Sequence, residues 1–230
     1  MPDSFVMNVK QEMPPLIAKI YAAQVADGSG EVYERFVGEL LSKISEPVNV
    51  LDVGCGPGHV CELLATRLRE TQVIGVDLSD TLIGIAGRNR KKLPNLTFEV
   101  GNALNLRFMD EEFDVAISVN SIKAWPDRRA GILQMTRVVR PGGKVIVFEC
   151  DPDCSKEAAE NFCSMWLWNI GLPGRLVAKL GRAWHFRRFV AGSGARHSEL
   201  RGLMEEAGLS EIESFSYVEL PFACAIGVKS

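Results

Sequence analysis

Short apolar runs and amphipathic stretches alternate along the middle of this chain. Apolar runs at 48–53, 72–76, 96–100, 113–119 and 144–149 are typical of strands that are buried on both faces. The stretches at 61–70, 81–92 and 128–139 carry apolar residues three and four positions apart, which predicts helices. Strands that alternate with helices form parallel sheets with helices on both faces. We therefore expect an α/β fold.

The two ends of the chain predict further elements around this alternating core. Helices are expected at 16–25 and 31–44, separated by a break at 27–30, and again at 157–170, 175–190 and 195–207. Strands are expected at 212–218 and 222–228. Residues 140–143, Arg-Pro-Gly-Gly, predict a turn into the strand that begins at Lys144.

Three glycines interrupt the pattern directly after the first strand of the core. Gly54, Gly56 and Gly58 stand between that strand and the helix that follows it. Glycine accepts positive φ and lets the backbone approach a ligand closely, and a helix N-terminus offers free N–H groups. This segment therefore predicts a turn that binds a nucleotide or a nucleoside.

Glycine spacing and two carboxylates indicate which ligand fits. The pattern is G-x-G-x-G rather than the dinucleotide fingerprint G-x-G-x-x-G. Asp52 stands at the end of the strand, where a carboxylate suits an ammonium better than a pyrophosphate. About twenty residues further on, Asp77 ends the second strand, where it can accept hydrogen bonds from a ribose. A ligand with a ribose, a cationic amino group and no phosphate fits better than NAD.

Several segments then resemble one known family. VLDVGCGPGHV (50–60) and VIGVDLSDTLIGIA (73–86) resemble the first two motifs of class I S-adenosylmethionine (SAM)-dependent methyltransferases, in the branch with small-molecule and quinone-biosynthesis methylases. The resemblance continues through 95–106, 113–127 and 136–149, in the right order and at the right separations. It implies a Rossmann-like, doubly wound seven-stranded sheet with an antiparallel last strand and helical cap segments. It also implies SAM as methyl donor and S-adenosylhomocysteine as product.

The resemblance also implies which residues bind the cofactor. They are Asp52, Gly54, Cys55, Gly56, Gly58, Asp77, Leu78, Asn102, Ala103, Val119 and Asn120. At the position of Asn102 the family usually carries an Asp that contacts the adenine amine. The amide oxygen of Asn102 can still accept from that amine.

By the same resemblance, residues 1–230 form a single methyltransferase domain with four parts. Residues 1–45 are an N-terminal helical lid, in which Tyr21 and Tyr33 could face the pocket, with helices that only flank the sheet edge as the alternative. Residues 46–150 are the SAM-binding core. Residues 151–195 are a substrate cap, and 196–230 form the final helix and strand pair. The basic stretch 175–196 has three interpretations: a solvated helix face, a basic mouth over an anionic substrate, or a contact with a membrane surface.

Methyl transfer requires alignment of the reactants, and it requires a general base only if the nucleophile is protonated. His185 and Lys123 are weak candidates, each weighed against a purely structural role, so the catalytic residue is unknown from the sequence. Lys123 and Ala124 stand where relatives often carry two histidines. His59 is expected beside the cofactor and His197 at a helix start.

Composition narrows the possible partners and location. The 230 residues carry a net charge of −3 and are 47% hydrophobic, which gives no overall attraction to nucleic acid or membrane. The six cysteines form no CxxC pair, which indicates a reducing cytoplasm and no metal site. We expect a small-molecule acceptor, either neutral or anionic, no nucleic acid partner, at most peripheral membrane contact, and a monomer or homodimer.

Three other functions stay open at this point. They are a SAM-binding regulatory protein without transfer activity, an RNA or protein methyltransferase, and a nicotinamide-dependent oxidoreductase. The net charge and the lack of an Asn-Pro-Pro-Tyr motif after the fourth strand disfavour the second, and the glycine spacing and Asp52 disfavour the third. Whether O, N, C or S is methylated is undetermined by the sequence.

Overall fold

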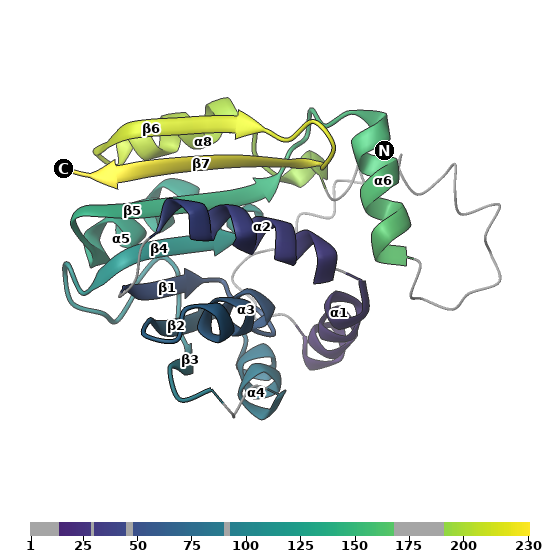
Figure 1. Cartoon of the computed structure of the whole chain (residues 1–230), viewed down its shortest axis with the longest axis horizontal. Helices are drawn as coiled ribbons and strands as arrows, with labels where there is room; N and C mark the ends of the chain where they lie inside the picture. Colours follow the sequence, from purple (N-terminus) through teal and green to yellow (C-terminus); the bar gives the residue numbers. More distant parts are fainter. Residues whose placement is uncertain (1–13, 29, 45–47, 90–92, 168–190) are drawn as a thin grey trace.

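A central sheet with helices on both faces forms the protein (Figure 1). The computed structural model describes residues 14–28, 30–44, 48–89, 93–167 and 191–230. Seven strands in this part of the chain pair in the order β3-β2-β1-β4-β5-β7-β6. They are β1 (Asn49–Val53), β2 (Gln72–Asp77), β3 (Leu96–Val100), β4 (Phe113–Val119), β5 (Val139–Cys150), β6 (Leu209–Ser216) and β7 (Phe222–Lys229). The pairs among β1 to β5 are parallel, whereas β7 is antiparallel to both β5 and β6, so the expected sheet is confirmed.

Helices α2 and α3 cover one face of the sheet, and α5 and α8 cover the other (Figure 1). Helices α1 and α6 lie near the end of the sheet to which the arrows of the parallel strands point (Figure 1). The described helices are α1 (Pro15–Gly28), α2 (Gly30–Lys43), α3 (His59–Arg67), α4 (Asp80–Asn89), α5 (Arg128–Val138), α6 (Lys156–Leu167) and α8 (His197–Glu206), with short 3-10 turns η1 (Ile122–Ala124) and η3 (Ala191–Ser193).

Two hydrophobic cores explain why the central strands β1 and β4 are largely apolar. Successive residues of a strand point to opposite faces, so Val50 packs with α2 and α3 while Leu51 packs with α5 and α8. Both side chains are fully buried. The ring of Phe148 on β5 lies 4.3 Å from that of Phe36 on α2, measured between centroids. Burial on both faces is what the near-continuous apolar runs predict.

The direction of chain progression reverses next to β1. β1 pairs with β2 on one side and with β4 on the other, so the connections that leave these strands run to opposite sides. Open α/β sheets bind ligands at the carboxyl ends of the strands at such a reversal. The glycine turn follows β1, and Asn120 follows β4, so both lie at this point.

Most predicted elements agree with the structure, and β3 and β4 have the predicted bounds. The turn predicted at 140–143 is wrong, because β5 already begins at Val139. The register passes from Phe113–Val139 to Val115–Lys144, so these residues form an irregularity within the strand, with Gly142 at φ 75°. The first helix continues to Gly28 and the last begins at His197. The helix predicted at 175–190 lies outside the described residues.

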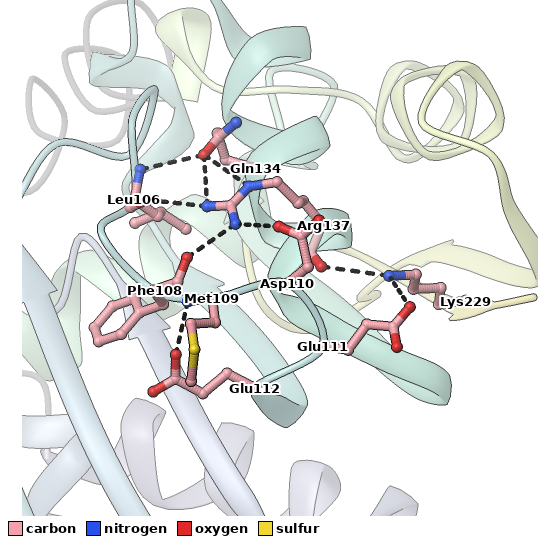
Figure 2. A network of polar contacts seen from close by, with 9 residues as sticks. All are labelled: Leu106, Phe108, Met109, Asp110, Glu111, Glu112, Gln134, Arg137 and Lys229. Carbon is pink, nitrogen blue, oxygen red and sulfur yellow. Dashed lines mark hydrogen bonds and ion pairs between the residues drawn. The ribbon is translucent and has the colours of Figure 1, made fainter.

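Arg137 of α5 fastens the connection between β3 and β4 (Figure 2). Its guanidinium donates to the carbonyl oxygens of Leu106 and Phe108, both at 2.9 Å, and to Asp110 at 2.6 Å. It also donates to the Gln134 side-chain oxygen, which accepts the Leu106 N–H at 3.2 Å (Figure 2). One planar cation thus satisfies several backbone acceptors.

We predict that Arg137→Met lowers the free energy of unfolding by about 2–4 kcal/mol, because it leaves two partly buried carbonyl oxygens without their donor. Urea unfolding measures the change. Arg129→Met is the control, because the ion pair of Arg129 with Glu206 is exposed and should contribute under about 1 kcal/mol. Equal effects of the two substitutions would contradict the role given to Arg137.

Candidate functional site

The turn between β1 and α3 has left-handed backbone at each of its three glycines. The φ values are 81° at Gly54, 54° at Gly56 and 80° at Gly58. The N–H groups of Gly54 and Cys55 both donate to the carbonyl oxygen of Val76, at 2.7 and 3.0 Å. These bonds hold the turn against the end of β2. The sequence folds this way locally because residues other than glycine rarely adopt this backbone conformation.

The three glycines differ in what surrounds them. A Cβ at Gly54 would lie 1.8 Å from the Ser121 hydroxyl oxygen, and one at Gly58 would lie 2.6 Å from the ring of Phe98. Packing within the protein therefore requires both. A Cβ at Gly56 would meet only a ring carbon of Tyr21, at 3.8 Å, among the described residues. Gly56 is buried, but its Cβ position is less crowded by the described residues than those of Gly54 and Gly58.

Asp77 ends β2 with its carboxylate held by two backbone donors. The N–H of Gly56 donates to one oxygen at 2.9 Å, and the N–H of Ser79 donates to the other at 2.8 Å. Burial raises the pKa of Asp77, and the two N–H bonds oppose that rise. Next to it Leu78 is 47% exposed, and Val100, at the end of the neighbouring strand, is 44% exposed. A fixed carboxylate thus lies close to two exposed apolar side chains.

Asp52 is buried beneath the glycine turn, with only 1% of its surface exposed. The thiol of Cys61 on α3 donates to its Oδ2 at 3.1 Å. Its Oδ1 is buried and accepts no hydrogen bond from the described residues. Desolvation raises the pKa of Asp52 to about 7. The site therefore contains a carboxylate without a cation from the described part of the protein.

Lys123, whose side chain is 20% exposed, and the fully buried Glu149 form an ion pair near the ends of β4 and β5. The Lys123 ammonium donates to Glu149 Oε1 at 2.9 Å, to the carbonyl oxygen of Asn120 at 2.9 Å, and to the side-chain oxygen of Asn120. Glu149 is fully buried and also accepts from the N–H groups of Lys123 and Cys150, at 3.1 and 2.8 Å. Burial lowers the pKa of Lys123, but the Glu149 carboxylate outweighs it, so this pKa is raised. All three donors of the Lys123 ammonium are thus bound by protein acceptors.

Two tyrosines from the N-terminal helices approach the same crevice. The Tyr21 ring of α1 lies against Gly56, and its pKa is raised by burial and then by the charges of Asp77 and Glu149. The phenol therefore keeps its proton at neutral pH. The Tyr33 ring of α2 stacks on His59, with 6.2 Å between centroids.

The remaining candidates have mixed outcomes. The side-chain oxygen of Asn102 accepts from the Leu104 N–H at 2.9 Å, so it is already engaged in a local turn. His185 lies outside the described residues. His197 begins α8, as predicted. Sequence reasoning missed Glu149 as a site residue, although a carboxylate directly after the apolar run at 145–148 was a signal for it.

Comparison with known proteins gives an independent measure of the resemblance. A family model described as "Methyltransferase domain" matches residues 50–143. A demethylmenaquinone methyltransferase of Bacillus licheniformis is 27% identical over 190 residues, 82% of this chain and 82% of its own.

Solved structures agree on the fold. A SAM-dependent methyltransferase from Methanococcus maripaludis has a TM-score of 0.70 at 16% identity and covers 100% of this chain and 97% of its own. One from Thermotoga maritima has a TM-score of 0.64 at 18% identity, covering 94% and 97%. With the glycine turn, the sheet order and these matches in agreement, this chain belongs to the class I SAM-dependent methyltransferases.

Proposed function

We propose that SAM binds in the crevice beyond the carboxyl ends of β1, β2 and β4. The observation that carries this proposal is the Asp77 carboxylate, which the N–H groups of Gly56 and Ser79 orient beside the glycine turn. Each of its oxygens has a remaining lone pair for a ribose hydroxyl. The proposed contacts are Asp52, Gly54, Cys55, Gly56, Gly58, Asp77, Leu78, Asn102, Ala103, Val119 and Asn120.

The charges of the crevice fit SAM better than a phosphate-bearing cofactor. Asp52 and Asp77 both lie at the glycine turn, and the nearby cation, Lys123, is already paired with Glu149. Two carboxylates repel a pyrophosphate, whereas SAM carries an ammonium and a sulfonium. The buried Oδ1 of Asp52 lacks a donor among the described residues, and an ammonium can supply one. The exposed side chains of Leu78 and Val100 offer apolar contact for the adenine ring.

The chemistry follows from positioning. Bound SAM supplies a methyl group made electrophilic by the adjacent sulfonium. The protein has to hold the acceptor in line with it, which by itself contributes several kcal/mol to catalysis. Asp77 and the glycine turn fix one end of the crevice, and the Lys123–Glu149 pair borders the other. Tyr21 lies against the turn at Gly56 and is affected by the charges of both Asp77 and Glu149. The protonated Tyr21 can donate a hydrogen bond, but it cannot serve as a base.

We further propose a small-molecule acceptor of the quinone type. The support is the relative named as a demethylmenaquinone methyltransferase, which matches along 82% of both chains. In this proposal, the helices α1 and α6 of the lid and cap segments border the acceptor, and the rest of both segments lies partly outside the described residues. Both helices lie near the carboxyl ends of the parallel strands (Figure 1).

A cytoplasmic location, as a monomer or homodimer, completes the proposal. All six cysteines are free thiols, and a reducing compartment preserves such thiols. The helices of the described segments include none that is long and apolar enough to cross a bilayer.

Calorimetric titration tests the proposed SAM site directly. We expect the wild-type protein to bind SAM and S-adenosylhomocysteine and not NADH. Asp77→Ala should lower the affinity for SAM at least about tenfold by removing the ribose acceptor. Gly56→Val should do the same by filling the space beside the turn. Glu70→Ala, at an exposed position in the loop after α3, is the control. Binding of NADH alone, or wild-type affinity for SAM in folded Asp77→Ala, would refute the proposal.

A second test uses the raised pKa of Asp52. Since its pKa is about 7 in the folded protein and near 4 when unfolded, ionisation favours the unfolded state progressively as pH rises between these values. The free energy of unfolding should lose up to about 4 kcal/mol from this group over that range. Asp52→Asn removes this loss, so its stability relative to wild type should rise from pH 4.5 to pH 7.5 in urea unfolding without ligand. A pH-independent difference would show that Asp52 is not buried as described.

A further inference from the structure

Asn120 at the end of β4 has both its backbone and its side-chain oxygen fixed. Its φ is 54°, which is uncommon outside glycine, and its N–H donates to the carbonyl oxygen of Phe148 at 2.6 Å. Its side-chain oxygen accepts from the Lys123 ammonium and from the Cys150 thiol, the latter at 3.0 Å. Lys123 also binds the Asn120 carbonyl oxygen.

These partners determine which way the amide faces. A lysine ammonium has only donors, so the atom that faces Lys123 must be the amide oxygen. Turning the amide over would place its NH₂ group against the ammonium and forfeit both bonds. The NH₂ group therefore points away from the ion pair, and it has no hydrogen-bond partner in the described part of the chain.

The position of Asn120 relates this free donor to the crevice. The next residue, Ser121, has its hydroxyl oxygen where a Cβ on Gly54 would be, so this segment lies directly against the glycine turn. Asp77 is on the β2 side of β1, whereas Asn120, Lys123 and Glu149 are on the β4 and β5 side. With the ribose at Asp77, the β4 and β5 side is left for the reacting end.

We propose that Lys123 and Glu149 are positioning residues that make Asn120 present its N–H donors to an oxygen of the methyl acceptor. This inference rests on the proposed function, because it takes the crevice to hold SAM and the acceptor together. It assigns the Asn120 amide group to the acceptor instead of to the SAM contacts proposed above. The acceptor class is an oxygen-bearing one: a phenol, quinol or enol, whose oxygen receives the hydrogen bond in neutral or ionised form. An amine or ammonium, which presents its own N–H groups, is disfavoured at this position.

The test compares two probes on the wild-type protein loaded with S-adenosylhomocysteine. They are 1,4-naphthoquinol, kept reduced, and 1-naphthylamine, which has the same ring system with an amine. We expect calorimetry to show the quinol binding at least about tenfold more tightly, as for one hydrogen bond gained against one lost. Binding of neither probe, or tighter binding of the amine, overturns the acceptor class. Binding of S-adenosylhomocysteine itself, measured first, reports separately on the proposed function.

Asn120→Asp reverses the polarity of the free group while it keeps an oxygen for Lys123. We expect the preference for quinol over amine to fall at least about tenfold. An unchanged preference would mean that the amide does not face the acceptor. A loss of S-adenosylhomocysteine affinity with an unchanged preference would place the amide on the cofactor and also overturn the proposal.

The ion pair is tested by the double variant Lys123→Met with Glu149→Gln, which keeps the shape and leaves no buried charge unpaired. We expect it to fold and to bind S-adenosylhomocysteine within about threefold of wild type, while quinol affinity falls about tenfold because the amide is free to turn. Lys156→Met is the control, since the ion pair of Lys156 with Glu160 is exposed. Wild-type selectivity in the double variant would show that the pair does not position Asn120. If the double variant does not fold, Asn120→Asp alone decides the proposal.

Discussion

The site depends on the close approach of three backbone segments that are distant in the sequence. The turn after β1 hydrogen-bonds to Val76 at the end of β2, and the segment after β4 places Ser121 where a Cβ on Gly54 would be. This approach is possible only because Gly54 has no side chain and tolerates positive φ. Once the turn is held there, its Gly56 N–H orients Asp77, and Asn120 comes to lie on the opposite side.

Buried charge is the basis of the selectivity proposed for the crevice. The carboxylates of Asp52, Asp77 and Glu149 lie near the carboxyl ends of β1, β2 and β5, but only Glu149 has an ion-pair partner among the described residues, Lys123. Asp77 has two backbone donors instead, and Asp52 has a thiol and an oxygen without a donor. Burial of a carboxylate is costly unless a cation or donors compensate it. A cationic ligand compensates the carboxylates that the protein itself leaves without a counter-charge.

Arg137 and Lys123 are both cations with bound backbone carbonyl oxygens, but one stabilises the fold and the other orients a residue of the crevice. Arg137 satisfies the carbonyl oxygens of Leu106 and Phe108 in the connection between β3 and β4, and its effect is on folding (Figure 2). Lys123 satisfies Asn120 and Glu149 within the crevice, and its effect is on which hydrogen-bonding atoms are offered to a ligand. Both cations have their donors occupied, so neither is available as a base or as a free anion-binding group.

The sequence alone determined the strand and helix alternation, the glycine turn and the carboxylates after it, because these are local patterns of side-chain size, polarity and backbone freedom. It also located β3 and β4 to the residue, since their apolar runs end at polar loops. The irregularity at 140–143 in β5 was not predictable, because Pro-Gly-Gly favours a turn locally and only pairing with β4 keeps it in the strand. The contact of Lys123 with Asn120 and Glu149 was also not predictable. Glu149 lies 26 residues from Lys123 in the sequence, and only the parallel pairing of β4 with β5 brings it near Lys123 and Asn120. Side-chain chemistry can be recognised in the chain, but the partner of each charge is decided by strand order and register.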